Sequence, residues 1–370
     1  MLKNNTAPPH DARLGAILRD DIRRGDFRRT MRRDYSELKE LFLDDIRKAR
    51  LKEMSPLKQW LYTTWWLFKS LLRKLTPARR LLLVVAITLA LLPQSIYYSG
   101  EHLRIHIETS VFAVVVILFI LMLELKDKLL ARDELEAGRA VQTSLMPDRE
   151  PTIPGWSTWL FTRTANEVGG DLVDFQKLSP DRFLVSLADV AGKGLKAALL
   201  TAKLQATLRA IAPESPNLPG LGQKINHIFY RDSLRSTFAS LVCVESSSGS
   251  SAVRILNAGH LPPILMREGI PGETRKGDPA IGILPDITCS EDVLELQKGD
   301  VLFLYSDGLT EAKNESGDFF GSRRLIGLLP FLAQSSAPEI GNRVLQEVDQ
   351  FIGEGSMYDD LSIVVLKRIA

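Results

Sequence analysis

Seven short runs rich in β-branched and aromatic residues follow Trp156, and they constrain the fold of this 370-residue chain more than any other feature. The runs come in adjacent pairs followed by pairs of helical stretches, rather than alternating strictly with helices. This order favours a layered α+β domain over a parallel α/β domain. The expected strands are 156–163, 171–178, 182–189, 237–244, 252–258, 300–306 and 361–367, and the expected helices are 194–211, 218–235, 322–334 and 338–353.

Aspartates stand at the ends of four of these expected strands, next to glycine or to another acid. Each one alone is ambiguous, because an aspartate that ends a strand is often a helix N-cap. Four carboxylates at strand ends can, however, converge on hard divalent cations, which prefer oxygen ligands. The four are Asp171 after Gly169-Gly170, Asp189 at the end of RFLVSLAD, Asp307 at the end of FLYSD, and Asp359, which precedes LSIVVL together with Asp360.

A glycine-rich turn follows Asp189. Gly192 and Gly194 permit a tight turn whose backbone approaches a ligand closely, and the helix that starts next can favour an anion at its N-terminus. Lys193 between them either meets a phosphate or points to solvent as an ordinary turn residue. A plain strand-to-helix turn explains the pattern equally well.

Charge is distributed unevenly along the chain. Residues 1–80 hold 20 Lys and Arg against 10 Asp and Glu, whereas residues 139–370 hold 23 against 28. An acidic C-terminal part argues against nucleic acid as its main ligand, since phosphate backbones need clustered cations. The basic residues 1–78 are expected to be a helical and juxtamembrane region, in which 11–53 is either a solvated helical pair or a partner-docking element, and 57–75 suits an interfacial amphipathic helix.

Two uncharged apolar stretches, 81–98 and 109–123, predict a transmembrane helical hairpin over 79–125 with spans of about 81–98 and 107–125. The alternative is a buried helical hairpin in a soluble domain. The flanking basic residues then place both termini in the cytoplasm by the positive-inside rule, and membrane lipid becomes an expected partner. Cys243 and Cys289 agree with this placement as reduced core residues.

The segment 126–147 is rich in strong helix formers, and Pro147 is expected to end the helix. It is either a passive spacer or a dimerising rod that passes an event from the preceding region to the domain 148–370.

The motifs of that domain resemble the metal-dependent protein phosphatase family (PPM, type 2C), and specifically its bacterial SpoIIE/RsbU-like branch. The resemblance covers about 135–370. It rests on EVGGDLVDF (167–175), LADVAGKGLKAALLTAKLQ (187–205), TFASLVCV (237–244), NAGHLPPIL (257–265), GILP (282–285), LQKGDVLFLYSDGLTEAKNESGDFFGSRRL (296–325) and YDDLSIVVLK (358–367).

This resemblance implies an αββα four-layer sandwich of two antiparallel sheets that holds two Mn²⁺ or Mg²⁺ ions. By position, Asp189 bridges the ions and the Val190 carbonyl completes one of them. Asp307 and Asp359 bind the other ion, Asp171 acts directly or through water, and Asp360 replaces Asp359 if the register is off by one. Asp189 and Asp171 are thus the expected catalytic carboxylates. Paired divalent ions lower the pKa of a water and neutralise phosphoryl charge.

Two positions depart from the family pattern. Many eukaryotic type 2C enzymes have a histidine beside the bridging aspartate, where this chain has Ala191, and aromatic residues often follow Gly-Gly-Asp, where this chain has Leu172 and Val173. His260 is the histidine in the matched motifs, and it either positions a loop at the cleft or has a structural hydrogen-bonding role.

The resulting prediction is a serine/threonine phosphoprotein phosphatase anchored in the inner membrane of a bacterium. Its expected substrate is a phosphorylated regulatory protein, such as an anti-sigma-factor antagonist in partner-switching signalling. Two alternatives stay open: a catalytically silent pseudophosphatase or membrane scaffold, and a phosphohydrolase acting on a small molecule.

Overall fold

A computed structural model describes residues 51, 54–91, 96–99, 104–107, 109–232, 237–355 and 357–370. The chain divides into two compact units, Met1–Lys128 and Leu129–Ala370. Nearly all of the stretch 11–53, for which two interpretations were open, lies outside the described residues.

The first unit is built from helices and one small hairpin. Helix α4 (Pro56–Lys74) covers the stretch expected to form an amphipathic helix, and α5 (Pro77–Leu91) follows it. Strands β1 (Ile96–Ser99) and β2 (Arg104–Ile107) pair antiparallel, and α6 (Thr109–Ser144) then runs for 36 residues. Arg79 at the start of α5 forms ion pairs of 2.6 Å with Glu124 and Asp127 of α6.

The predicted membrane anchor is wrong. Within the described ranges, no helix combines the length and the apolarity that crossing a bilayer requires. Helix α5 has 15 residues, or about 22 Å, against the roughly 30 Å of a hydrocarbon core. Residues 96–98 of the first expected span belong to a strand, and in α6 the charged residues Glu124, Lys126 and Asp127 end the apolar run that reaches Leu123. The predicted two-span hairpin and inner-membrane localisation are therefore wrong. The expectation of a lipid partner depended on them and is no longer supported.

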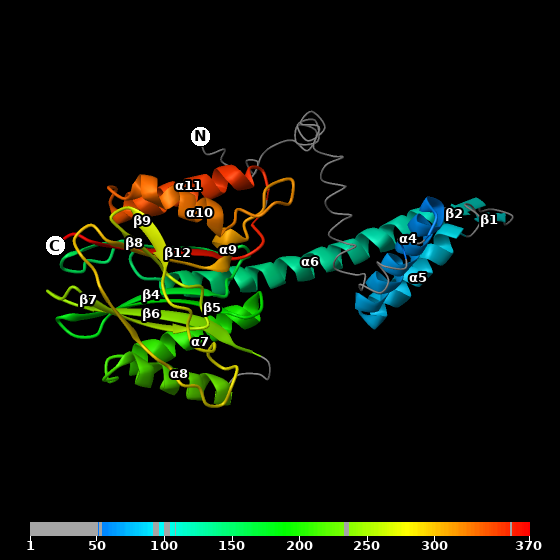
Figure 1. Ribbon diagram of the computed structural model, residues 1–370. Helices are drawn as coiled ribbons and strands as arrows, with labels where there is room; N and C mark the ends of the chain where they lie inside the picture. Colours follow the sequence, from blue (N-terminus) through cyan, green and yellow to red (C-terminus); the bar gives the residue numbers. More distant parts are fainter. Residues whose placement is uncertain are drawn as a thin grey trace, which may run out of the picture. The chain divides into compact units, whose positions relative to one another are not determined.

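The second unit is an αββα sandwich, as predicted (Figure 1). One five-stranded sheet has the order β10-β7-β6-β5-β4 and the other has the order β3-β12-β11-β8-β9, with antiparallel pairing throughout. The strands of the first sheet are β10 (Asp292–Glu295), β7 (Ala252–Ala258), β6 (Ala239–Ser247), β5 (Arg182–Val190) and β4 (Asp171–Lys177). Those of the second are β3 (Trp156–Arg163), β12 (Leu361–Arg368), β11 (Val301–Tyr305), β8 (Ile264–Arg267) and β9 (Ile270–Glu273).

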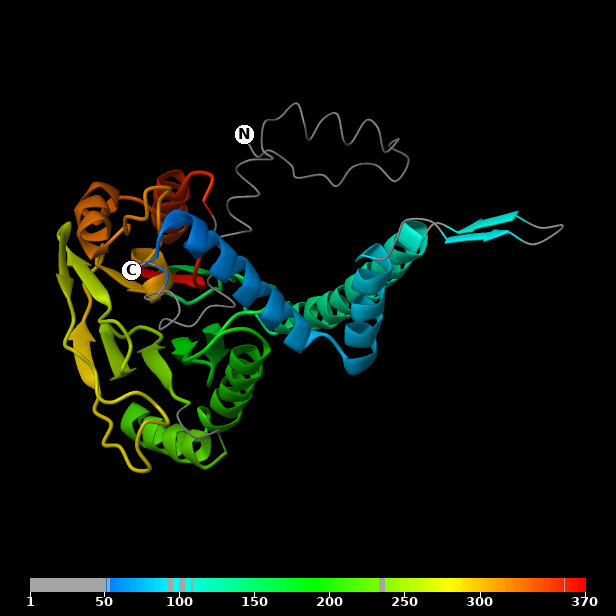
Figure 2. The ribbon, with the colours of Figure 1, turned by 90° about the vertical axis from the view of Figure 1, so that its right-hand side faces the viewer.

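Helices cover the outer face of each sheet (Figures 1 and 2). Helices α7 (Leu195–Ile211) and α8 (Leu218–Asp232) lie on the first sheet. Helices α10 (Ser322–Leu328) and α11 (Ala337–Ile352), with the short 3-10 helix Leu329–Leu332 between them, lie on the second. The short helix α9 (Asp307–Thr310) directly follows β11.

Three hydrophobic clusters fill the three spaces between the four layers. One joins α10 and α11 to the second sheet, one joins α7 and α8 to the first sheet, and the third lies between the two sheets. Strand β11 shows why its sequence is apolar throughout: Val301, Phe303 and Tyr305 face the helices, while Leu302 and Leu304 face the other sheet. Side chains alternate between the faces of a strand, so a strand buried on both faces has no polar positions.

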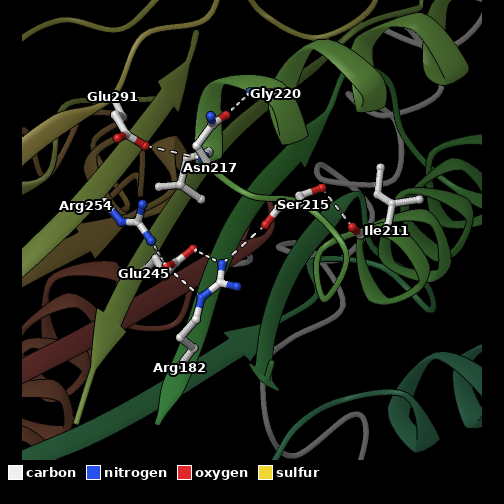
Figure 3. A network of polar contacts seen from close by, with 9 residues as sticks. Arg182, Ile211, Ser215, Asn217, Gly220, Glu245, Arg254 and Glu291 are labelled. Carbon is white, nitrogen blue, oxygen red and sulfur yellow. Dashed lines mark hydrogen bonds and ion pairs between the residues drawn. The ribbon is translucent and has the colours of Figure 1, made fainter. Parts of the chain in front are cut away.

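Charged side chains fix the end of β5 that lies away from Asp189. Glu245 of β6 is 2% exposed and pairs with both Arg182 and Arg254, and Arg182 also donates to the Ser215 carbonyl (Figure 3). A buried carboxylate requires such compensation, because removal from water is costly for an unpaired charge. The two ends of β5 therefore differ: one is closed by ion pairs, and the other leads to the acidic residues.

Gly341 allows α11 to approach β3 closely. A Cβ atom at this position would meet the ring of Trp159, which is 2% exposed. Gly327 of α10 provides a contrast, since a Cβ atom there would meet nothing within 4 Å.

We predict that Gly341→Ala destabilises the protein by about 1–3 kcal/mol through overpacking, although alanine is the better helix former. Gly327→Ala is the matched control and should be neutral or stabilising by up to about 1 kcal/mol. Urea unfolding of the full chain measures both. Equal effects of the two substitutions would contradict the close packing of α11 on Trp159.

Candidate functional site

The antiparallel topology brings the predicted acidic residues to one edge of the sandwich. Asp171 begins β4 and lies opposite Asp189 near the end of β5. In the other sheet, β11 ends two residues before Asp307, while Asp359 and Asp360 directly precede β12. Because the Tyr305 end of β11 pairs with the start of β12 at Ile363, these acids also share an edge.

Asp171 is the most buried of these carboxylates, with 7% of its surface exposed. Burial, followed by the charge of Asp189, raises its pKa well above the usual value. The Ser362 hydroxyl donates to Asp171 Oδ2 at 2.6 Å and opposes this shift. A serine of the second sheet thus orients a carboxylate of the first sheet.

The anionic forms of Asp189 and Asp307 are destabilised by burial and by neighbouring negative charges. Burial, and then the charges of Asp307 and Asp359, raise the pKa of Asp189 to about 6. Burial and the charge of Asp359 raise the pKa of Asp307. The four acids therefore interact electrostatically across the two sheets, and a cation near them would relieve this repulsion.

Asp360 differs from its neighbour Asp359, because its carboxylate is engaged by the backbone. Its Oδ1 accepts from Ala165 N at 2.7 Å and its Oδ2 accepts from Gly170 N at 2.6 Å. A Cβ atom on Gly169 would lie 2.6 Å from the same Oδ2, so glycine is required at this approach. Asp360 thereby anchors the turn that leads into Asp171.

The glycine-rich turn after β5 places the Lys193 ammonium group beside Asp359. Gly192 and Gly194 have φ angles of 121° and 70°, which non-glycine residues rarely adopt. Lys193 Nζ between them donates to the Tyr358 carbonyl at 2.7 Å and lies 3.0 Å from Asp359 Oδ2. Val190, whose carbonyl is a predicted metal ligand, is fully buried at the end of β5. Its N–H donates to Gly170 O.

His260 joins the two sheets behind the acidic residues. Its Nε2 lies 3.2 Å from the Tyr305 carbonyl and its Nδ1 lies 2.7 Å from Ser240 Oγ. A carbonyl only accepts, so we assign the proton to Nε2, and Nδ1 then accepts from Ser240. Ser240 pairs with Asp189 in β6–β5, and Tyr305 precedes Asp307 by two residues. Burial lowers the pKa of His260 to about 4.

A family model described as "Stage II sporulation protein E (SpoIIE)" matches residues 179–369, which is more than half of the chain. The chain belongs to the SpoIIE family. The resemblance drawn from the motifs is thereby confirmed, and Asp189, Asp307, Asp359 and Asp360 lie within the matched residues, whereas Asp171 precedes them.

Individual proteins are similar over about two thirds of this chain. Protein IcfG of Synechocystis sp. is 28% identical over 277 residues, which is 66% of this chain and 43% of IcfG. Phosphoserine phosphatase RsbU of Bacillus subtilis is 23% identical over 239 residues, 64% of this chain and 70% of RsbU. The chain thus spans less than half the length of IcfG.

The SiaA-PP2C domain of Pseudomonas aeruginosa has the same fold. It is 21% identical, covers 65% of this chain and 98% of its own, and superposes with a TM-score of 0.56.

Two sets of contacts in this SpoIIE-family domain were not predicted from the sequence. The Gln142 amide near the end of α6 donates to Gly169 O at 2.8 Å and accepts from Gly169 N at 3.1 Å. Arg209 of α7 pairs with the fully buried Asp174 at 2.6 Å and donates to the Leu145 carbonyl. Neither contact follows from a motif or a periodicity, because each joins segments far apart in the sequence.

The carboxylate oxygens of Asp171, Asp189, Asp307 and Asp359 are the ligand type that a hard divalent cation prefers. Across the described part of the chain, no three His, Cys, Asp or Glu side chains are arranged to hold one ion together. Mg²⁺ nevertheless usually keeps several waters and binds through one or two carboxylates, so three protein side chains around one ion are not required. Burial first, and then the neighbouring acids, raise the pKa values of Asp189 and Asp307, and a bound cation would offset both effects.

We predict that His260 makes the stability of this domain depend on pH. Its pKa in the folded protein, about 4, lies below the usual 6.5, so the neutral ring stabilises the fold above pH 6.5. This contribution is lost as the pH falls from 6.5 towards 4, and it amounts to roughly 3 kcal/mol.

Urea unfolding of the wild type and of His260→Gln over this pH range tests the prediction. The glutamine keeps a donor and an acceptor but does not titrate, and subtracting the two curves cancels the titration of Asp189. The difference in unfolding free energy should change steadily below pH 6.5, and parallel curves would exclude a buried neutral His260.

Proposed function

We propose that the chain is a metal-dependent phosphoprotein phosphatase that acts on phosphoserine or phosphothreonine. The observation that carries this proposal is the clustering of Asp171, Asp189, Asp307 and Asp359 at one edge of the sandwich. There, burial and neighbouring negative charges raise the pKa values of Asp171, Asp189 and Asp307. Membership of the SpoIIE family and the name of the relative RsbU, a phosphoserine phosphatase, point to the same chemistry.

In this proposal the acidic residues hold two Mn²⁺ or Mg²⁺ ions. Asp189, the Val190 carbonyl, Asp307 and Asp359 are the groups that would hold these ions. Bound divalent cations supply a water of lowered pKa and offset the charge of the phosphoryl group. Asp171 would orient this water or hold a cation directly, and the Ser362 hydroxyl fixes its Oδ2.

The remaining residues of the site position the carboxylates. Asp360 holds the backbone of the Gly169-Gly170 turn through Gly170 N. His260 links β11, which ends just before Asp307, to β6, which pairs with the strand that carries Asp189. With both ring nitrogens engaged and a pKa of about 4, His260 is neutral near pH 7 and is a poor proton donor to a leaving oxygen.

The proposed substrate is a phosphorylated regulatory protein, such as an anti-sigma-factor antagonist in partner-switching signalling. Its support is the similarity to RsbU, of which this chain covers 70%. A phosphoprotein screen against the full chain with and without Mn²⁺ distinguishes this substrate class from a small phosphorylated metabolite.

We predict that Asp189→Asn or Asp307→Asn lowers Mn²⁺-dependent hydrolysis of a phosphoserine protein by at least roughly a hundredfold, since each removes a charged group that faces the reacting centre. Asp181→Asn is the matched control, because Asp181 is an exposed aspartate just before the other end of β5. Release of inorganic phosphate is measured, with circular dichroism to verify folding. Wild-type turnover in either site variant would reject the assignment of these carboxylates.

We further propose that α6 mediates a homodimer. Leu129, Leu130 and Val141 are 51–61% exposed on this helix, and a second copy of the chain would cover them. Leu130→Glu should raise the dimer dissociation constant by roughly tenfold or more, whereas Lys128→Glu on the same exposed helix should change it less. Sedimentation of the full chain measures the dissociation constant, and a monomeric wild type at all concentrations tested would refute the dimer.

A further inference from the structure

Lys193 connects two segments that are far apart in the sequence. Its backbone lies in the turn between β5 and α7, and its side chain reaches the residues that precede β12. Nζ donates to the Tyr358 carbonyl at 2.7 Å and lies 3.0 Å from Asp359 Oδ2. The flanking Gly192 and Gly194 have positive φ angles, which set the direction of this turn.

The charge of Lys193 acts on more than its direct partner. It lowers the pKa of Asp189 and of Asp307, against the larger effects of burial and of the neighbouring acids. The ammonium therefore contributes positive charge to the carboxylate cluster. Asp359 Oδ1 already accepts from Asp360 N at 3.1 Å, so a divalent cation that bound Oδ2 would displace the ammonium or share this oxygen with it.

The pairing is suited to exchange. The Lys193 side chain is 58% exposed and that of Asp359 is 41% exposed. Exposed ion pairs are weak, so the ammonium can leave Asp359 at little cost. Lysine is also a common phosphate-binding residue that acts as a mobile point charge on a flexible stem.

We propose that Lys193 exchanges partners: it neutralises Asp359 in the metal-free protein and binds a phosphoryl oxygen of the substrate once a divalent cation occupies Asp359. This inference rests on the proposed function, since it requires a phosphate group at the acidic edge. It assigns Lys193 two opposite effects: its charge weakens cation binding and strengthens phosphate binding.

Lys313 provides a matched control, because it contacts Tyr358 through the ring. Its Nζ lies 4.8 Å from the ring centroid of Tyr358 and 5.1 Å from that of Phe319. It therefore holds the same segment through an aromatic ring, whereas Lys193 holds it through the backbone carbonyl and the Asp359 carboxylate.

The test compares the full-length wild type with Lys193→Met, Lys193→Arg and Lys313→Met by calorimetric titration. Mn²⁺ is titrated into the metal-free proteins, and inorganic phosphate is then titrated into the Mn²⁺-saturated proteins. Lys193→Met should bind Mn²⁺ about two- to fivefold more tightly and phosphate about tenfold more weakly. Lys193→Arg should stay close to the wild type in Mn²⁺ affinity, and Lys313→Met in both affinities.

The opposite signs are decisive, because a lysine that only supports the loop would weaken both affinities or neither. The exchange is wrong if Lys193→Met leaves either affinity unchanged, or if Mn²⁺ binding weakens. Both titrations are independent of turnover. A wild type that fails to hydrolyse phosphoserine would contradict the proposed function, while the two affinities would still decide the role of Lys193.

Discussion

The site depends on the buried Asp360 carboxylate, which holds the start of β4 against the start of β12. Its two oxygens accept from Ala165 N and Gly170 N, so one side chain of the second sheet fixes the turn that enters the first sheet. Thr201 of α7 also donates to Gly170 O at 2.6 Å. With this turn fixed, Asp171 lies opposite Asp189, and the β4–β5 register determines which side chains can approach each other.

Bringing these acids together is unfavourable for the fold on its own. Asp171 is buried and Asp189 is half-buried beside like charges, and both prefer the protonated form more than a free aspartate does. The surrounding sandwich offsets this cost through three apolar layers, which hold the strands in register whatever the charge at their ends. Functional sites commonly retain local destabilisation that the rest of the fold compensates.

The sequence was informative where a strand is buried on both faces. β3 and β7 were predicted with their observed bounds, and β11 and β12 to within one residue at each end. Strands β8, β9 and β10 were missed, because each has four residues and lies at or next to a sheet edge, with too little alternation to recognise. The positions of the acids followed from strand ends, but the backbone partners of Asp360 and the bridging contacts of His260 depend on the packing of two sheets.

The membrane prediction failed because composition does not determine where a helix stops. An uncharged run gives an upper limit for an apolar helix, whereas the chain turns into β1 within the first run and meets Glu124, Lys126 and Asp127 after the second. Arg79 then pairs with two of these acids, which gives the polar end of α6 a partner in α5.

The linker is more than a spacer at its C-terminal end. Gln142 bonds both backbone groups of Gly169, and the Leu145 carbonyl accepts from Gln205 and Arg209 of α7. Gly169 adjoins Gly170, whose N–H binds Asp360, and α7 begins directly after the turn that carries Lys193. The end of α6, together with Leu145 that follows it, therefore contacts the Gly169-Gly170 turn and the second half of α7. A displacement of this helix end would break hydrogen bonds to the Gly169-Gly170 turn, so its position and the geometry of Asp171 are physically coupled.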